Sequence, residues 1–196
     1  MNKFIKYIII FILCISLIPS CMMGGIAVSG AQAIYDRKNI QKKLDDNYTT
    51  LQAYREIYFK TNEFQNTHIS IATFNDSLII TGQIPEATQK EKITKIVKNL
   101  SSDREVFNFT EIATPSSTLT RASDTWITSK IKAKLIAANN IDPSKIKVLT
   151  ENGTVFLMGI TKKNEATKAI EITKNTSGVQ GIVKVFSYIE IIKEKT

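Results

Sequence analysis

The sequence has few of the side chains on which most enzyme chemistry depends. Its 196 residues include one histidine, His68, and two cysteines, Cys14 and Cys21. A Ser-His-Asp or Cys-His nucleophile would depend on His68 alone, at the start of a predicted strand, and a zinc site built on histidine needs more than one. Neither a GxGxxG pattern nor a P-loop for binding phosphates occurs. We therefore predict a protein with no catalytic residue, no metal site and no cofactor.

Two remaining chemical groups have simple structural interpretations. His68 stands at the start of a predicted strand, where we expect an exposed or half-packed side chain. The carboxylate pair Asp45-Asp46 falls at the end of a predicted tether, where we expect both side chains to face water.

The sequence also lacks an apolar run long enough to span a bilayer. The uncharged run Tyr7 to Ile18 has twelve residues, whereas a membrane-spanning helix needs about 20. Lys3 and Lys6 precede the run, and Ser20-Cys21 follows it. This order is typical of an export signal, so residues 1–20 are predicted to be a signal peptide that is removed.

The end of this signal resembles a bacterial lipobox, Leu17-Ile18-Pro19-Ser20-Cys21, which predicts that Cys21 becomes the acylated first residue. The alternative is an ordinary signal peptide that ends near an incidental cysteine. After removal of Cys14 the chain would hold one thiol, so Cys21 could form no intramolecular disulfide. Multiple acyl chains give a stable membrane anchor. Residues 21–45 are then a lipidated N-terminus and tether. Met22 favours the outer membrane, because an Asp at this position would retain a lipoprotein at the inner membrane.

Charge is unevenly distributed along the chain. Residues 21–119 have 11 Lys and Arg against 11 Asp and Glu, whereas residues 120–196 have 13 against 7. The basic C-terminal half is suited to anionic partners, although scattered lysines can equally be a solvated surface. Nucleic acid is excluded as a partner, because the chain is exported and lacks the alternating aromatic and basic residues of common RNA-binding modules.

The chain repeats itself at an offset of 77 residues. One set of positions aligns without gaps onto another: Ile69, Ile71, Leu78, Ile80, Gly82, Ile93, Val106 and Phe109 onto Ile146, Val148, Val155, Leu157, Gly159, Ile170, Val183 and Phe186. A duplicated structural unit follows.

The second copy shows the elements of the unit most clearly. A helix over 125–137, with Asp124 as its N-cap, is predicted from the spacing of Ile127, Ile131 and Leu135. Strands over 146–150 and 154–160 flank Asn152-Gly153, a strong signal for a hairpin turn. A helix over 163–175 and a strand over 182–191 follow. The order α-β-β-α-β predicts a three-stranded mixed sheet covered by two helices.

The same order in the first copy divides the chain into two tandem α+β domains. We predict a first domain over 46–113, a linker over 114–122, a second domain over 123–191 and a basic C-terminal tail over 192–196. Gly82 and Gly159 close the second strand of each copy, and together with Asn152 and Gly153 they are predicted to be structural turn residues.

These features resemble the BON (bacterial OsmY and nodulation) domain family, in particular its dual-domain outer-membrane lipoproteins. The stretches that carry the resemblance are Asp124-Thr125-Trp126-Ile127-Thr128, Thr150-Glu151-Asn152-Gly153 and Val155-Phe156-Leu157-Met158-Gly159, behind the lipobox. The resemblance implies a non-enzymatic protein that binds phospholipid on the periplasmic side of the outer membrane, supports envelope integrity and is linked to sites of cell division.

Trp126, the single tryptophan, is the best candidate for lipid contact. It lies about 100° around the predicted helix from the apolar stripe, where an indole can insert at the depth of lipid headgroups. Lys130 and Lys134 follow at i+4 and i+8 on the same side and can meet anionic headgroups. With the neighbouring Thr125, these residues form the predicted lipid-binding site. The alternative is that Trp126 packs over the sheet edge or the other domain, beside solvated lysines.

A protein-interaction scaffold is the competing function. Two tandem domains could hold an envelope protein, and the basic half would then steer an acidic partner. The leading prediction remains an anionic phospholipid membrane as partner, with a covalent lipid on Cys21.

Overall fold

The computed structural model describes residues 30–60, 62–101 and 103–189, with side chains from residue 40 onward. The predicted signal peptide, Cys21 and the predicted tail over 192–196 lie outside the described residues. Residues Asn39–Thr196 form one compact unit, and all packing described below lies within it.

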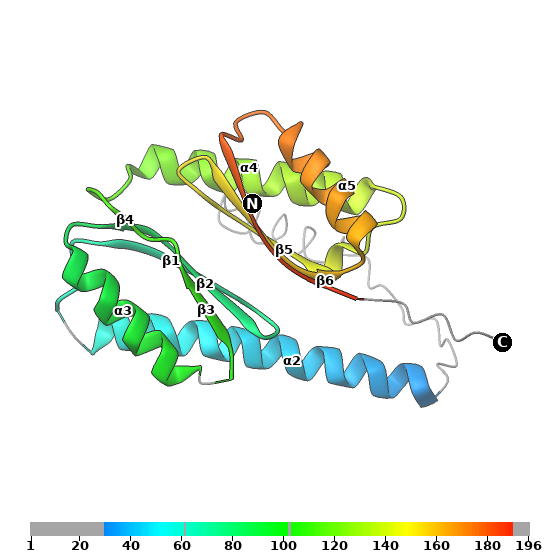
Figure 1. Ribbon diagram of the computed structural model, residues 1–196, viewed down its shortest axis with the longest axis horizontal. Coiled ribbons are helices and arrows are strands. Elements are labelled where there is room, and N and C mark those ends of the chain that lie inside the picture. Colours follow the sequence, from blue (N-terminus) through cyan, green and yellow to red (C-terminus); the bar gives the residue numbers. More distant parts are fainter. Residues whose placement is uncertain (1–29, 61, 102, 190–196) are drawn as a thin grey trace, which may run out of the picture. The chain divides into compact units, whose positions relative to one another are not determined.

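Figure 1 shows the elements in chain order. They are α2 (Gly30–Tyr54), the π-helical turn η1 (Arg55–Phe59), β1 (His68–Phe74), β2 (Ser77–Ile84), α3 (Ala87–Leu100), β3 (Glu105–Asn108), β4 (Glu111–Ile112), α4 (Thr118–Ala137), the 3₁₀ turn η2 (Pro143–Lys145), β5 (Ile146–Glu151), β6 (Thr154–Thr161), α5 (Lys163–Lys174) and β7 (Gly181–Tyr188).

Each copy has the predicted order and a mixed sheet, so the predicted α+β fold is confirmed. In the second copy β5 pairs antiparallel with β6, and β7 returns parallel to β6. In the first copy β1 and β2 form the same antiparallel pair. Its third strand is broken into β3 and β4, which both run parallel to β2. The helix in each crossover explains why the returning strand is parallel.

One face of each sheet packs against the helices of its own copy. Period-two alternation along β5 and β6 turns one set of apolar side chains toward α4 and α5. The resulting core holds Ile127, Ile131, Leu135, Ile141, Ile146, Val148, Val155, Leu157 and Ala169. The first copy buries the corresponding set against α2, η1 and α3: Ala53, Ile57, Phe64, Ile69, Ile71, Leu78, Ile80, Ile84, Ile93 and Val97.

The opposite faces of the two sheets pack against each other. Ala72 and Ile79 of the first sheet form a third buried cluster with Phe156 and Met158 of the second. Phe109 and Phe156 meet across it with ring centroids 5.3 Å apart. Each sheet is thus buried on both sides, which explains the nearly continuous apolar runs in β2 and β6.

Asp124 has a different role from the predicted N-cap. The helix α4 begins at Thr118, inside the predicted linker, and Ser117 caps it by accepting a hydrogen bond from the Thr120 amide. Asp124 lies within the helix, buried, and its carboxylate accepts hydrogen bonds from the amides of Asn152 and Gly153 at 2.8 and 2.9 Å. The two amides of this tight turn need hydrogen-bond acceptors, and the carboxylate of Asp124 on α4 provides one for each.

Asp46 serves the first hairpin in the same way, so the prediction that it faces water is wrong. It is buried, and it accepts a hydrogen bond from the Asn75 amide at 2.9 Å. Arg104 contacts both Asp45 and Asp46. The part of the predicted tether from Gly30 onward is helical, because α2 continues through these positions.

The first helices of the two copies correspond at an offset of 78, one more than the strands. Thr50 bonds Thr73 at 2.8 Å as Thr128 bonds Thr150 at 2.7 Å, and Asp46 corresponds to Asp124. The extra residue of the first copy falls where its helix ends in the π-helical turn η1.

Asn152 and Gly153 form the hairpin turn between β5 and β6, whereas Gly82 and Gly159 lie inside β2 and β6, two residues before each strand ends. Asn152 and Gly153 have φ of 48° and 74°, as a two-residue hairpin turn with the native twist requires. Gly82 has φ of 115°, and a Cβ there would lie 2.0 Å from the His68 carbonyl oxygen. At Gly159 a Cβ would lie 2.5 Å from the Lys145 carbonyl oxygen.

Two tyrosines of the first copy bond the backbone of β1. The Tyr54 and Tyr58 hydroxyls accept hydrogen bonds from the amides of Ile71 and Ile69 at 2.8 and 2.9 Å. Burial is the main cause that raises the pKa of Tyr54 above its model-compound value of 10.0. A raised folded pKa means that this contribution to stability is complete below pH 10 and lost as pH rises through the folded pKa.

We therefore expect the free energy of unfolding to fall above pH 10, partly through Tyr54. In Tyr54→Phe the fall between pH 9 and 11 should be smaller than in the wild type. Urea unfolding followed by circular dichroism at several pH values measures the difference. Equal slopes in both proteins would contradict this assignment.

Candidate functional site

The predicted lipid-binding residues lie on the solvent side of α4. Ile127, Ile131 and Leu135 face the core, and Trp126 is 66% exposed. The alternative in which Trp126 packs over the sheet or the other domain is therefore not the arrangement seen. An exposed indole on a rigid helix is available to a second surface.

The exposed apolar surface of α4 is longer than the sequence pattern suggested. Leu119 is 81% exposed and Ile136 is 71% exposed, and both lie on the same side of the helix as Trp126. Ala122, Ser129 and Ala133 fill the turns between them and are also exposed. Leu119, Trp126 and Ala133 recur at seven-residue intervals. The predicted helix began at Thr125, so it left Leu119 out of this pattern. We call Leu119, Ala122, Trp126, Ser129, Ala133 and Ile136 the α4 stripe.

Lys130 stands beside Trp126 as predicted. Its ammonium lies 6.0 Å from the centre of the indole ring, within the range of a cation–π contact. The same Nζ donates a hydrogen bond to the Ser177 carbonyl at 2.6 Å. A lysine ammonium has three donors, so Lys130 keeps its charge and donors for an anion at the surface.

Lys134, one turn further on, is held by the loop after α5. Its Nζ donates hydrogen bonds to the Asn175 carbonyl at 3.1 Å and to the Thr176 hydroxyl at 3.0 Å. The two lysines therefore form a fixed basic edge along one flank of the α4 stripe, although Lys134 itself is exposed to solvent.

Thr125 lies on the other flank of α4. Its hydroxyl donates a hydrogen bond to the Arg121 carbonyl at 2.9 Å, within the helix. The hydroxyl oxygen can still accept a hydrogen bond. Thr125 is exposed, but it is not joined to Lys130 or Lys134 in one cluster.

The first copy has a weaker version of this surface. At the offset of 78, Trp126 corresponds to Tyr48, Lys130 to Gln52 and Lys134 to Glu56. Tyr48 is exposed too, but Gln52 donates a short hydrogen bond to its hydroxyl and Glu56 pairs with Lys60 at 2.6 Å. Among the residues of the two first helices whose side chains are described, only α4 has lysines at both i+4 and i+8 from an exposed aromatic residue.

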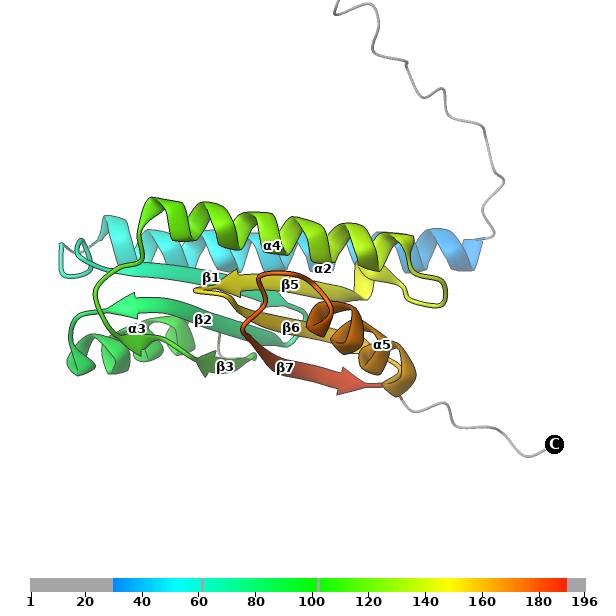
Figure 2. The same cartoon turned by 90° about the horizontal axis from the view of Figure 1, so that it is seen from above.

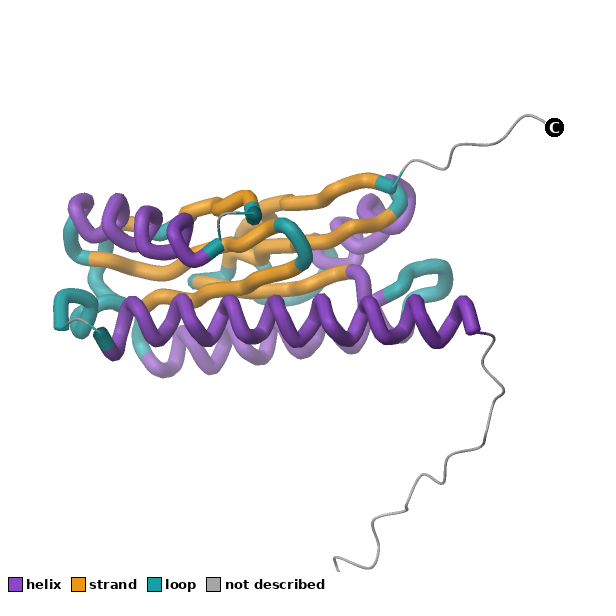
Figure 3. The backbone as a smooth tube through the Cα atoms, turned by 90° about the horizontal axis from the view of Figure 1, so that it is seen from below, coloured by secondary structure: helices purple, strands orange, loops and turns teal. Residues whose placement is uncertain are grey.

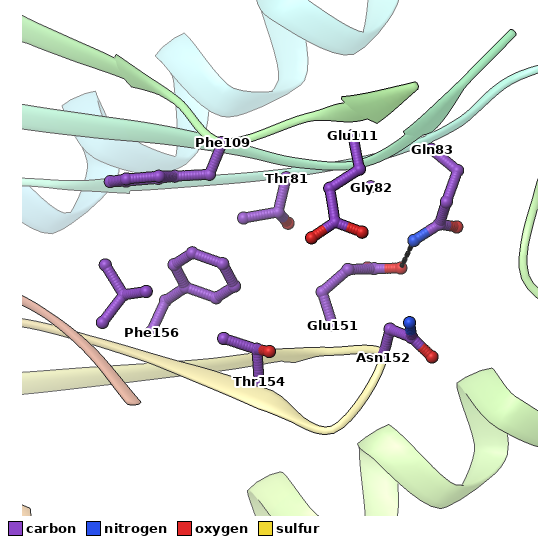
Figure 4. A pocket seen from close by; sticks show the side chains of 10 residues that line it. Thr81, Gly82, Gln83, Phe109, Glu111, Glu151, Asn152, Thr154 and Phe156 are labelled. Carbon is purple, nitrogen blue, oxygen red and sulfur yellow. Dashed lines mark hydrogen bonds between the residues drawn. The ribbon is translucent and has the colours of Figure 1, made fainter. Parts of the chain in front are cut away.

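A cavity of about 150 Å³ lies between the two sheets. Figure 4 shows Glu111 and Glu151 within it, near Gln83. Glu151 is only 7% exposed, and it accepts hydrogen bonds from the Ser70 hydroxyl at 2.9 Å and from Gln83 Nε2 at 3.0 Å. A carboxylate that is held in this way stabilises the contact between the copies.

His68 belongs to the same interdomain network, and the predicted half-packed position is confirmed. Its Nε2 lies 3.4 Å from Glu151 and its Nδ1 lies 3.4 Å from the Arg121 guanidinium. The amide of Ser116, in the connection between the copies, donates a hydrogen bond to the Gln83 side-chain oxygen at 3.0 Å. The histidine therefore helps to join α4 and β5 to β1.

Within residues 30–60, 62–101 and 103–189, no three His, Cys, Asp or Glu side chains lie where they could share a metal ion. In the same part of the chain, every helix is too short or too polar to cross a bilayer.

Two regions of the chain, residues 51–114 and 123–190, match the BON domain. The protein belongs to the BON-domain family. This BON protein is similar to the outer membrane lipoprotein DolP of Haemophilus influenzae, with 25% identity over 87% of this chain and 88% of that relative. It is 29% identical to a 21 kDa hemolysin of Actinobacillus pleuropneumoniae, over 64% of this chain and 65% of that protein. The osmotically-inducible protein Y of Escherichia coli is 28% identical, with 71% of this chain and 70% of that protein covered.

Proposed function

We propose that this BON-domain protein is an outer-membrane lipoprotein, anchored through acylated Cys21, that binds anionic phospholipid through α4 of its second domain. It faces the periplasm, has no enzymatic activity and supports the integrity of the envelope, including at division sites. Its relative in Haemophilus influenzae is named as an outer membrane lipoprotein, and the lipobox-like segment supports the same anchor here.

The observation that carries the proposal is the α4 stripe beside a fixed basic edge. Trp126 and the other apolar residues of the stripe can enter the interface of a bilayer, while Lys130 and Lys134 remain at headgroup level. The first domain supports the assignment by contrast, since Gln52 and Glu56 replace the two cations there.

Vesicle binding tests the proposal with a fragment of residues 22–196. Asn39–Thr196 is one compact unit that contains all the buried clusters of the described residues, so we expect this fragment to fold. It should bind vesicles of phosphatidylglycerol and phosphatidylcholine and bind pure phosphatidylcholine weakly. Trp126→Ala should weaken binding at least about 10-fold, because burying a large apolar side chain contributes roughly 1.5–3 kcal/mol. Lys130→Gln should weaken binding about 5-fold.

Tyr48→Ala and Lys162→Gln are matched controls, because Tyr48 is exposed on α2 and Lys162 is exposed just before α5. Both should bind as the wild type does. Equal binding by Trp126→Ala would show that α4 is not the lipid site. Failure of the wild type to bind any protein-free vesicle would favour the alternative, a scaffold for an envelope protein.

The anchor has a separate test. Mass spectrometry of the mature protein from membranes should find Cys21 as the first residue, carrying acyl chains. An unmodified protein that starts at another residue would overturn the anchor and the localisation, whatever the result with vesicles.

A further inference from the structure

A groove lined by lysines lies between the first helices of the two domains. Figures 2 and 3 show α2 and α4 along the same side of the stacked sheets, next to β1 and β5. Lys43 of α2, Lys132 of α4 and Lys147 of β5 line a cavity there of about 240 Å³. The other residues that line it are Asp46, Asn47, Thr73, Phe74 and Ile146.

The cations in this groove outnumber the carboxylates available to them. Asp46 is the single carboxylate among the described residues that line it, and it already accepts hydrogen bonds from Asn75 and Arg104. Within the described part of the chain, the side chains of Lys43 and Lys132 have no hydrogen bond or ion pair. The groove therefore sets three lysine charges against one carboxylate, that of Asp46, which Arg104 also contacts.

Lys147 is the most enclosed of the three cations. Its Nζ donates one hydrogen bond, to the Thr73 carbonyl at 2.9 Å, and keeps two donors. Burial lowers the pKa of Lys147, and the nearby charge of Lys132 lowers it further, while Asp46 acts in the opposite direction. A second negative group in the groove would offset both effects by its attraction for the Lys147 ammonium.

The internal repeat shows that the fold does not require these lysines. The corresponding positions are Arg121 for Lys43, Tyr54 for Lys132 and Ser70 for Lys147. Tyr54 and Ser70 form hydrogen bonds within the structure, to Ile71 and Glu151. The same topology is thus built once with uncharged residues at two of the three positions, and once with three like charges that repel each other.

We propose that the groove formed by Lys43, Lys132 and Lys147 binds a phosphate group. Lysine ammoniums bind phosphate oxygens as point charges, and three of them around one cavity suit a tetrahedral anion. The volume corresponds to roughly eight waters, which leaves room for the phosphate and part of the group that bears it. Lys132 lies on the opposite flank of α4 from Lys130 and Lys134, so this site is separate from the basic edge beside Trp126. It also gives the first domain a role in binding.

Phosphate titration of the ¹⁵N-labelled fragment of residues 22–196 tests the site directly. Adding inorganic phosphate should shift the amide signals of Thr73, Phe74 and Lys147 in a saturable manner at constant ionic strength. The double variant Lys43→Gln/Lys132→Gln changes two exposed helix positions and should weaken this binding at least 10-fold. The control Lys162→Gln/Lys163→Gln removes the same charge from the exposed start of α5 and should bind phosphate as the wild type does.

Vesicles of phosphatidylglycerol and phosphatidylcholine then identify the source of the phosphate. If the groove variant also binds vesicles at least 5-fold more weakly than its control, the ligand is a lipid headgroup. If vesicle binding is unchanged while phosphate binding is lost, the ligand is a soluble phosphate compound. Absence of saturable shifts in the groove, or equal weakening in both double variants, would overturn the proposal. Trp126→Ala leaves the groove intact, so failure of the α4 site and failure of the groove are distinguishable.

Discussion

Gly82→Ala is expected to destabilise the protein by roughly 3 kcal/mol or more, enough to unfold the first domain at moderate temperature. The φ of Gly82 is 115°, a conformation that residues with a Cβ rarely adopt. A Cβ would also lie 2.0 Å from the His68 carbonyl oxygen on the paired strand β1. Strain and overlap must both be relieved by moving the backbone of the hairpin.

Gly181→Ala is the matched control for this prediction. Gly181 begins β7, and a Cβ there would come no closer than 3.3 Å to the Thr154 side chain. We expect a change of less than about 1 kcal/mol in thermal or urea unfolding. Equal stability of Gly82→Ala and the wild type would show that the hairpin relaxes freely at this position.

Asp124→Ala is expected to cost about 2–4 kcal/mol of unfolding free energy. The substitution leaves the buried Gly153 amide and the partly buried Asn152 amide without their acceptor, and an unpaired buried amide costs about 1–3 kcal/mol. Asp124 is only 5% exposed, so water replaces it poorly. Urea unfolding of the variant, followed by circular dichroism, measures the loss.

Asp76→Ala provides the comparison, because Asp76 is an exposed hairpin aspartate that pairs with Lys42 at 2.9 Å. A surface ion pair of this kind contributes roughly 0–1 kcal/mol. If Asp124→Ala were no more destabilising than Asp76→Ala, the carboxylate would not be what holds the second hairpin.

The fold was predictable because its signals are local. The Asn152-Gly153 turn, the period-two strands beside it and the helical spacing of Ile127, Ile131 and Leu135 each depend on neighbours in sequence. The repeat offset then transferred these elements to the first copy, where the turn is Asn75-Asp76. Element order and sheet direction followed from general rules on hairpins and crossovers.

The role of Asp124 was not predictable in the same way. Its sequence context fits an N-cap, and the residue that it serves, Asn152, lies 28 positions away. Ser117 was the better cap, but the Ser and Thr residues that follow Pro115 are equally typical of a linker. Local sequence patterns indicate which side chains can accept a hydrogen bond from a backbone amide. They do not indicate which distant amide needs such an acceptor.

The two candidate sites differ in how far the sequence could predict them, again because one depends on local spacing and the other on distant contacts. Trp126, Lys130 and Lys134 lie on one helix, so helical spacing alone brought them together, although it missed Leu119 and Ile136. The groove joins Lys43, Lys132 and Lys147 from three elements, and only the packing of one domain on the other places them around one cavity.

The face-to-face packing of the sheets also bears on how a duplicated chain evolves. The interface resembles that of a homodimer with its two halves joined in one polypeptide. In a true homodimer, every substitution changes both halves of the interface at once. Here Ser70 and Lys147 are equivalent positions, yet Ser70 donates to Glu151 while Lys147 donates to the Thr73 carbonyl. Because the two halves have separate sequences, one end of the interface can hold the cationic groove and the other the buried carboxylate network.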